Sequence, residues 1–170
     1  MQGATIKTAS AKPDCVNDGR YANLLPTMKM YLILVMGVCL EHAAAHGQCN
    51  DAVKQQLIRM GALLILEGYS VTHELRCDQL RDDYSDTYNF YLRNDKKYTI
   101  IGACDNDCRD LDLCLYDENG NEIDCDGKVY DKPVVSASPL WSGSFTLKVK
   151  MYDCRANPCA FGIMVFGKDR

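Results

Sequence analysis

The second half of the chain alternates apolar and polar positions in short runs. Tyr88, Phe90 and Leu92 fall at every second position, and residues 145–152 repeat this spacing. A period of two is expected of a strand with one buried face. About seven short strands are predicted in this way, at residues 87–93, 98–103, 111–116, 122–125, 133–138, 145–152 and 161–166. Turn residues separate them at regular intervals, which is typical of an antiparallel β-sandwich.

A helical pattern precedes these strands. Apolar residues recur at a spacing of three or four positions at Val53, Leu57, Met60 and Leu64. Asn50 or Asp51 is suited to cap the start of a helix, and Gly68 is suited to end it. Residues 69–86 are polar and show no period. We therefore expect a helix and an irregular connector over residues 46–86, followed by a β-sandwich domain over residues 87–170.

The N-terminal region has the pattern of an export signal. A basic start at residues 28–30 leads into an apolar run at residues 31–40 and then into three alanines at residues 43–45. This order is typical of a secretory signal peptide, and it predicts a mature chain that begins near His46. The run is shorter than the roughly 20 residues that a bilayer-spanning helix needs, so we expect no membrane span in the mature chain. A buried helix and a membrane anchor are the alternatives.

Residues 1–27, ahead of this signal, have no periodic pattern and few large apolar residues. We interpret them as a disordered leader or as the product of a misassigned translation start. The signal peptide proper is then residues 28–45. The predicted localisation of the mature chain is secreted or periplasmic.

The cysteine content indicates the same compartment. The sequence has ten cysteines, and removal of residues 1–45 leaves eight of them, an even number. Disulfide bonds explain this content in an exported protein better than metal thiolates or redox groups, because no C-x-x-C spacing occurs. The expected pairs are Cys104–Cys108, Cys154–Cys159, Cys114–Cys125 and Cys49–Cys77.

Two signals conflict in the hairpin that residues 111–125 are predicted to form. A register that allows the Cys114–Cys125 disulfide places Leu115 opposite Asp124. A three-residue loop that ends at a left-handed Gly120 instead pairs Leu115 with Ile123 on the core face and separates the two cysteines. A local bulge would restore the disulfide.

Several short segments within residues 87–168 carry a family resemblance, namely Tyr98 to Gly102, Cys104 to Cys108, Asp110 to Leu113, Tyr116 to Asp117, Gly120 to Asn121, Asp131 to Val135, Pro139 to Phe145 and Cys154 to Cys159. Through these segments, residues 87–168 resemble the pre-peptidase C-terminal domain family of secreted bacterial proteins. The resemblance covers about half of the chain and implies a jelly-roll-like β-sandwich. Domains of this family follow a catalytic domain, often a protease, and collagen-binding relatives also bind calcium. The resemblance therefore implies a binding or accessory role.

Acidic residues are concentrated between residues 104 and 126, where nine acids stand against one basic residue. Four of them bring hard oxygen ligands close together: Asp105, Asp107, Asp110 and Asp112. Calcium takes six to eight oxygen ligands, and a divalent cation would relieve the repulsion between these carboxylates. The spacing differs from that of an EF-hand loop. We expect Ca²⁺ as a cofactor at these four residues, and a solvated acidic turn is the alternative.

Catalytic motifs do not occur in the predicted mature region. It contains only two histidines, His46 and His73, and it has no G-x-S-x-G, no H-E-x-x-H and no glycine-rich phosphate loop. The net charge of −4 argues against a nucleic-acid partner, because phosphate binding needs a basic face. We therefore expect no enzymatic activity.

Aromatic side chains on the predicted strands and turns favour a binding function. The candidates are Trp141, Tyr88, Tyr91, Tyr116 and Tyr152. Aromatic residues on a flat sheet bind sugars or protein surfaces, although they also serve as half-buried cross-strand partners. The sequence thus predicts a secreted or periplasmic binding or accessory module that recognises a protein or polysaccharide surface. An accessory domain of a secreted hydrolase, or such a hydrolase itself, is the alternative.

Overall fold

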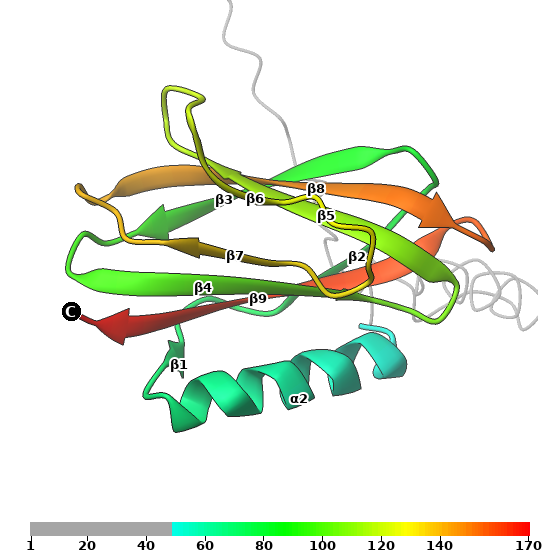
Figure 1. Cartoon of the computed structure of the whole chain (residues 1–170), viewed down its shortest axis with the longest axis horizontal. Coiled ribbons are helices and arrows are strands. Elements are labelled where there is room, and N and C mark those ends of the chain that lie inside the picture. Colours follow the sequence, from blue (N-terminus) through cyan, green and yellow to red (C-terminus); the bar gives the residue numbers. More distant parts are fainter. Residues whose placement is uncertain (1–48) are drawn as a thin grey trace, which may run out of the picture. The chain divides into compact units, whose positions relative to one another are not determined.

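The computed structural model describes residues 49–170, which fall within one structural unit, His46–Arg170. The expectations for residues 1–27 and 28–45 lie outside the described residues. Within residues 49–170 the chain forms one helix and nine strands (Figure 1).

Helix α2 spans Asp51–Leu66, as the apolar spacing predicts. The side chain of Asn50 accepts a hydrogen bond from the backbone N–H of Ala52 at 2.9 Å and so caps the first turn. Gly68 follows the last turn with a φ of +89°, a left-handed conformation that glycine adopts easily. In the part of the chain that the structure describes, no helix has both the length and the apolar character needed to cross a membrane.

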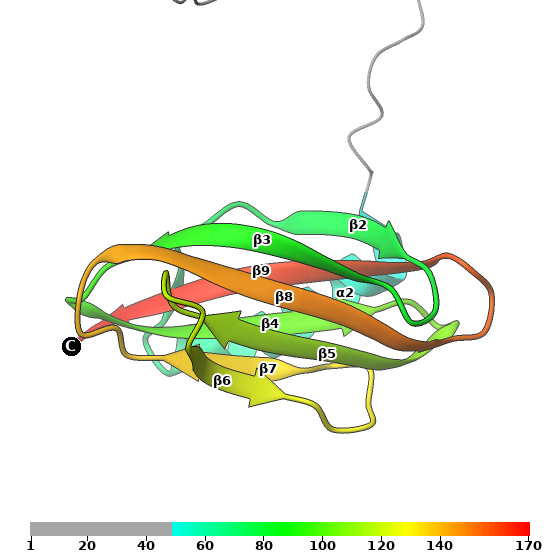
Figure 2. The ribbon, with the colours of Figure 1, turned by 90° about the horizontal axis from the view of Figure 1, so that it is seen from above.

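The nine strands form two antiparallel sheets that stack face to face (Figures 1 and 2). Sheet A has the order β1-β9-β4-β7, and β2 also pairs with β9. Its strands are β1 (Ser70–Val71), β2 (Arg76–Leu80), β4 (Lys96–Cys104), β7 (Val134–Ala137) and β9 (Cys159–Asp169). Sheet B has the order β3-β8-β5-β6. Its strands are β3 (Ser85–Leu92), β5 (Cys108–Tyr116), β6 (Glu122–Asp126) and β8 (Gly143–Cys154).

The predicted antiparallel β-sandwich with an N-terminal helix is confirmed, and the seven predicted strands correspond to β3 through β9. The expectation of an irregular connector at residues 69–86 is wrong, because this segment contains β1 and β2. Both strands pair with β9, where Val71 lies opposite Phe166 and Cys77 lies opposite Gly162. Their residues are mostly exposed, so no buried face imposes an alternation on their sequence.

The main hydrophobic core lies between the two sheets. Alternate residues of β5 and β8 fill its centre, namely Leu111, Leu113, Leu115, Phe145, Leu147, Val149 and Met151. Full burial of a side chain of this size stabilises a fold by about 1.5–3 kcal/mol. This burial is the physical cause of the period of two in the sequence.

A second, smaller core lies between α2 and the outer face of sheet A (Figure 1). Val53 and Leu57 of the helix pack above Gly162 of β9, where an added Cβ would lie 2.9 Å from each of these side chains. An added Cβ at Gly61 of the helix would lie 2.5 Å from the ring of Phe166. Glycine on both elements therefore lets the helix and the strand approach closely.

From β2 to β9, every connection passes from one sheet to the other except the β5–β6 hairpin. Two of these crossings are neighbours, because Cys108 at the start of β5 pairs with Cys154 at the end of β8. Each crossing is closed by a predicted disulfide, Cys104–Cys108 or Cys154–Cys159, and all four cysteines are buried. The two sheets are thus joined covalently at this end.

The other two predicted disulfides are also present. Cys49–Cys77 ties the residue before the helix cap to β2, and Cys114–Cys125 joins β5 to β6. All eight cysteines of residues 49–170 are therefore paired as expected.

The β5–β6 hairpin reconciles the two conflicting signals. Its three-residue loop ends at Gly120, which has a φ of +81°, and a bulge follows where the register shifts at the end of β5. The bulge places the Cys114–Cys125 pair directly opposite each other and sets Leu115 opposite Asp124. The alternative pairing of Leu115 with Ile123 is wrong, since Ile123 lies in the bulge and is exposed.

Candidate functional site

The four aspartates predicted as calcium ligands divide into two pairs. Asp105 and Asp107 lie in the turn between β4 and β5, whereas Asp110 and Asp112 lie on the outer face of β5. The carboxylate of Asp105 accepts hydrogen bonds from the backbone N–H of Ala160 at 2.7 Å and of Asp107 at 3.3 Å. Asp105 therefore fastens the two neighbouring chain crossings to each other.

Asp117 also has a structural role, at the β5–β6 loop. Its carboxylate accepts hydrogen bonds from the backbone N–H groups of Asn119 and Asn121, and from the side-chain amide of Asn121. The side-chain hydrogen bond from Asn121 is the main cause that lowers the pKa of Asp117. The ionised carboxylate thus holds the loop in its conformation.

Asp124 and Asp126 of β6 join the two sheets along one side of the sandwich, because both accept hydrogen bonds from the backbone of β7. Because β7 is the last strand of sheet A, the N–H groups on its free side need partners. Asp124 accepts a hydrogen bond from Ser136 N–H at 2.7 Å, and Asp126 accepts one from Val134 N–H at 3.0 Å. Asp126 also accepts a hydrogen bond from the hydroxyl of Tyr130. Burial raises the pKa of Asp126, but these hydrogen bonds have the larger combined effect and lower it overall.

The negative charges of Asp110 and Asp112 are less well compensated by hydrogen bonds than those of Asp117 and Asp126. One carboxylate oxygen of each is buried without a hydrogen-bond partner in the described structure, and the same holds for one oxygen of Asp126. Burial, followed by the charges of Asp110 and Asp126, raises the pKa of Asp112 to about 6, and Lys150 on β8 opposes this shift. Burial also raises the pKa of Asp110. The outer face of β5 therefore holds two carboxyl groups for which ionisation is unfavourable.

The structure does not gather the predicted calcium ligands into one site. Within residues 49–170, no three carboxylates have oxygens that all lie within 4.8 Å of one another. Calcium takes six to eight oxygen ligands at about 2.3–2.6 Å. Of the predicted ligands, Asp105 is already engaged by backbone donors, whereas Asp110 and Asp112 each keep one buried oxygen without a hydrogen-bond partner, of the hard type that calcium prefers. Calcium binding at this pair stays a prediction.

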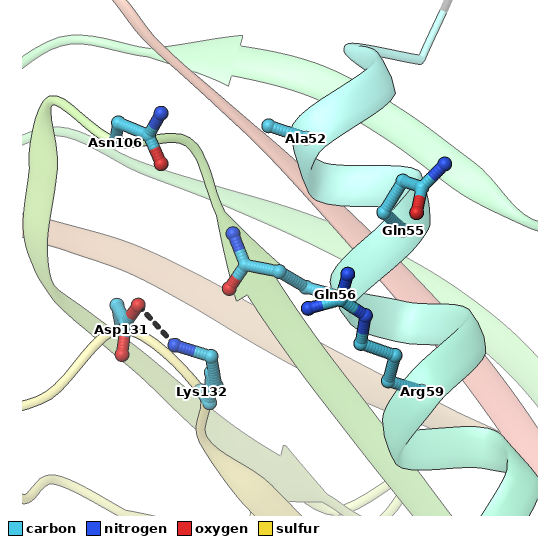
Figure 3. Close-up of a pocket in the computed structure, with 7 residues that line it drawn as sticks. All are labelled: Ala52, Gln55, Gln56, Arg59, Asn106, Asp131 and Lys132. Carbon is cyan, nitrogen blue, oxygen red and sulfur yellow. Dashed lines mark hydrogen bonds and ion pairs between the residues drawn. The ribbon is translucent and has the colours of Figure 1, made fainter.

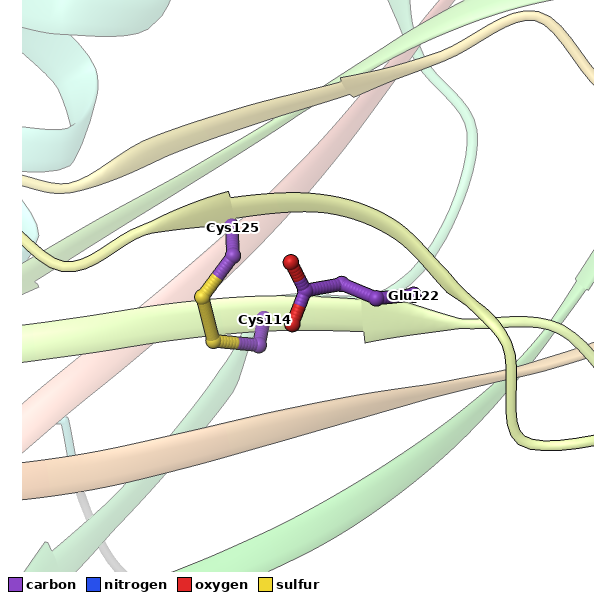
Figure 4. Close-up of side chains that lie close together, drawn as sticks. All are labelled: Cys114, Glu122 and Cys125. Carbon is purple, nitrogen blue, oxygen red and sulfur yellow. A yellow bond between two sulfur atoms is a disulfide. The ribbon is translucent and has the colours of Figure 1, made fainter.

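Cys114, Glu122 and Cys125 are the three side chains of the described segment that do meet the distance criterion for a metal site (Figure 4). The two sulfurs form a disulfide and are not available as thiolates. Cys125 is exposed and Cys114 is partly exposed on the outer face of sheet B. The cluster is therefore an accessible disulfide beside an acidic side chain.

Three of the five predicted aromatic residues lie on the outer face of sheet B. Tyr91 of β3, Tyr116 of β5 and Tyr152 of β8 occupy positions that alternate with core residues. Tyr91 is 63% exposed, and the ammonium of Lys150 lies 3.7 Å from the ring centroid of Tyr152. These three tyrosines define what we name the tyrosine face.

The other two aromatic residues have structural contacts. Tyr88 is half-buried, its ring centroid lies 6.2 Å from that of Phe161, and its hydroxyl donates a hydrogen bond to Asp78. Trp141 stacks on Phe145 with ring centroids 6.0 Å apart and donates its indole N–H to Glu118 at 2.8 Å. Neither belongs to the tyrosine face.

A polar pocket of about 430 Å³ lies between α2 and two loops of the sandwich (Figure 3). One wall is the first half of α2, a second is the β4–β5 turn, and a third is the loop before β7. The lining residues are Ala52, Gln55, Gln56, Arg59, Asn106, Asp131 and Lys132. The sequence gives no signal for this pocket, because its walls come from three separate segments.

Comparison of the sequence with models of known protein families gives no match, and comparison with curated proteins gives none either. The resemblance to pre-peptidase C-terminal domains accordingly stays a prediction. Residues 49–170 are identified by their structure alone, as a small disulfide-stabilised antiparallel β-sandwich that carries one helix on the outside of sheet A.

Proposed function

We propose that the chain is a non-catalytic, secreted or periplasmic module that binds a polysaccharide or protein surface through the tyrosine face. The four disulfides support the compartment, because such bonds form and persist in oxidising environments. The covalent link between the two sheets supports a role as a rigid platform. A binding surface on a rigid sheet loses little conformational entropy when it meets its partner.

The pair Tyr91 and Tyr116 carries this proposal. Tyr91 lies opposite Ser144 and Tyr116 lies opposite Thr146, so β8 separates the two tyrosines. The usual spacing of strands and residues places them roughly 12 Å apart. Between them, the hydroxyl of Thr146 donates a hydrogen bond to the side chain of Asn89 at 2.9 Å. Two aromatic rings that flank polar side chains on the outer face of a sheet match the apolar faces and hydroxyl groups of a sugar chain.

Native gel electrophoresis in the presence of soluble polysaccharides tests this proposal. We expect at least one neutral or acidic polysaccharide to retard the wild-type protein. We expect Tyr91→Ala and Tyr116→Ala each to weaken that binding by up to roughly tenfold, the effect of losing one aromatic stacking contact.

Tyr84→Ala is the matched control. Tyr84 is 61% exposed, but it lies before β3, at the opposite end of that strand from Tyr91. We expect this variant to bind as the wild type does. If Tyr91→Ala and Tyr116→Ala also bind as the wild type does, the tyrosine face is not the binding surface. If no polysaccharide retards the wild type, the partner is not a polysaccharide.

A secreted hydrolase is the second candidate function, and Asp112 is the observation that favours it. A carboxyl group with a pKa of about 6 beside a second carboxyl group is an arrangement that general acid catalysis uses. Both groups lie on the outer face of β5, and neither lines the polar pocket. Release of reducing ends from a bound polysaccharide, lost in Asp112→Asn, would support hydrolysis. Binding without release supports the non-catalytic module.

A further inference from the structure

We propose that the polar pocket beside α2 binds a hydroxylated carboxylate, of which a hexuronic acid is the simplest example. None of the residues that line this pocket belongs to the tyrosine face. The proposal for the polar pocket and the proposal for the tyrosine face can therefore be tested independently of each other.

The backbone of Cys104 fixes two walls of the pocket. Its carbonyl accepts a hydrogen bond from the side-chain Nε2 of Gln56 at 2.9 Å, and its N–H donates to the carbonyl of Asp131 at 3.3 Å. Cys104 is fully buried, and its disulfide to Cys108 closes the turn that carries Asn106. All three walls are therefore attached to one rigid residue, and the pocket is preformed before a ligand enters.

The charges of the lining favour an anion. Lys132 pairs with Asp131, whereas Arg59 has neither an ion-pair nor a hydrogen-bond partner within residues 49–170. Two cations against one acid leave an excess of one positive charge, in a chain whose net charge is −4. A guanidinium binds a carboxylate through two parallel hydrogen bonds. Arg59 therefore supplies the anchor for a carboxylate.

Gln56 adds a requirement for a hydrogen-bond donor. Its Nε2 is committed to Cys104, while its Oε1 is buried and accepts no hydrogen bond within the described structure. Figure 3 shows the Gln56 side chain directed from the helix toward the loop that carries Asp131 and Lys132. A buried acceptor without a donor raises the free energy of the protein. A ligand hydroxyl that reaches this oxygen would remove that penalty.

These two requirements select among small anions. A phosphate dianion has one O–H to donate, but its two negative charges exceed the single excess positive charge of the lining, and Asp131 would repel it. A zwitterionic amino acid has no net charge to match the excess positive charge of the lining. A sugar acid has one carboxylate for Arg59 and several hydroxyls for Gln56 and Asp131. The pocket volume of about 430 Å³ lies within the range of small-molecule sites.

Titration calorimetry of the disulfide-bonded protein with D-glucuronate, D-glucose, inorganic phosphate and glycine tests the proposal. We expect glucuronate to bind roughly tenfold more tightly than each of the other three, because only glucuronate meets both requirements. Arg59→Gln should weaken glucuronate binding by roughly tenfold and leave the weak binding of glucose unchanged. Arg59 is exposed, so this substitution does not disturb the core.

Arg76→Gln is the matched control, because Arg76 is an exposed arginine of β2 that does not line the pocket. This variant should bind glucuronate as the wild type does. Glucuronate binding that equals glucose binding, or that is unchanged in Arg59→Gln, would overturn the proposal. Equal binding of phosphate or glycine would overturn the assignment to a sugar acid.

Gln56→Met tests the donor requirement separately. It should weaken the binding of glucuronate more than the binding of acetate, which has the carboxylate but no hydroxyl. An unchanged ratio of the two affinities would overturn the role of Gln56, and the Arg59 variant decides the proposal if Gln56→Met does not fold.

A free sugar acid and a residue of an acidic polysaccharide present the same chemistry. A uronate trisaccharide that binds more tightly than the monosaccharide assigns the site to the polymer. Weaker binding of the trisaccharide assigns it to the free acid.

Discussion

Asp112 is the acidic residue whose charge the fold compensates least. Its pKa is raised to about 6 by burial and, after that, by the neighbouring charges of Asp110 and Asp126. A raised pKa means that the folded state holds the proton more tightly than the unfolded chain does. The contribution of Asp112 to the stability of the fold is therefore most favourable below the unfolded-state pKa of about 4 and is lost as the pH rises through about 6.

We predict that Asp112→Asn increases the free energy of unfolding by about 1 kcal/mol at about pH 7.5, and that this gain disappears at about pH 4. A shift of roughly two pKa units corresponds to nearly 3 kcal/mol, and partial exposure of the carboxylate reduces this figure. Urea denaturation at both pH values measures the difference. Asp107→Asn, in the exposed β4–β5 turn, is the control and should change stability by less than about 0.5 kcal/mol.

A comparison of the wild type with Asp112→Asn also tests whether calcium binds at Asp110 and Asp112. A bound cation would offset the repulsion between these carboxylates, so it would raise the melting temperature of the wild type above its value in a chelator. Asp112→Asn should lack this response. A wild-type melting temperature that is the same with calcium and with chelator excludes a stabilising calcium site on β5.

At the residue level, the sequence shows where the acids are concentrated but not what each acid does. Asp105 and Ala160 are 55 positions apart, yet the carboxylate of the first accepts a hydrogen bond from the second. Asp124 likewise depends on Ser136, a residue of the other sheet. Only the folded chain separates these satisfied carboxylates from Asp110 and Asp112. The predicted ligand set therefore combined residues with different roles.

Among the elements, the contact between α2 and β9 depends on small residues. Alanine favours a helix over glycine by about 1 kcal/mol, so Gly61→Ala would stabilise an isolated helix. In this fold the added Cβ would lie 2.5 Å from the ring of Phe166, which is only 1% exposed and has little room to move. We predict that overlap dominates and that Gly61→Ala lowers the free energy of unfolding by about 1–3 kcal/mol.

Ala62→Gly provides the comparison, because Ala62 is the next residue of α2 and is exposed. It should lower stability by about 0.5–1 kcal/mol through helix propensity alone. The substitutions are chemical opposites, yet both should destabilise in thermal and urea unfolding. A more stable Gly61→Ala would mean that the helix does not rest on Phe166.

Elements with one buried face could be predicted from the sequence, and elements without such a face could not. The alternation of β5 and β8 follows from burial of residues such as Leu113 and Leu147. β1 and β2 escaped prediction because they are short and mostly exposed. The bulge in β6 left only an indirect trace, namely the disagreement between the Gly120 loop and the Cys114–Cys125 register.

For the molecule as a whole, the four disulfides differ in exposure. Cys104–Cys108 and Cys154–Cys159 are buried, whereas Cys114–Cys125 lies on the outer face of sheet B. A thiolate must reach a sulfur atom to open a disulfide. We predict that a dilute dithiol reductant opens Cys114–Cys125 first while the protein stays folded.

Differential alkylation followed by peptide mass mapping measures this order. Cys49–Cys77 is half-buried and should open after Cys114–Cys125 but before the two buried disulfides. Labelling of all four pairs at the same rate would contradict the prediction, because it would mean that reduction requires unfolding of the whole domain.

The candidate binding surfaces differ in how far the sequence foretold them. The alternation of apolar and polar positions places Tyr91 and Tyr116 out of phase with the core residues of their strands. The tyrosine face could therefore be predicted from the sequence pattern. Arg59 and Lys132 belong to segments that only tertiary folding brings together. A pocket of this kind has no local signature.

The two carboxylates between β6 and β7 have a consequence for solubility. An edge strand with free N–H groups is a template on which another chain can add a strand, and repeated addition leads to aggregates. Asp124 and Asp126 occupy the N–H groups of Ser136 and Val134 and place negative charge along the same line. Because the pKa of Asp126 is lowered, its part of this protection persists below the pH at which an ordinary aspartate takes up its proton. The carboxylates of Asp124 and Asp126, which satisfy the edge of sheet A, thus keep other molecules from adding a strand to that edge.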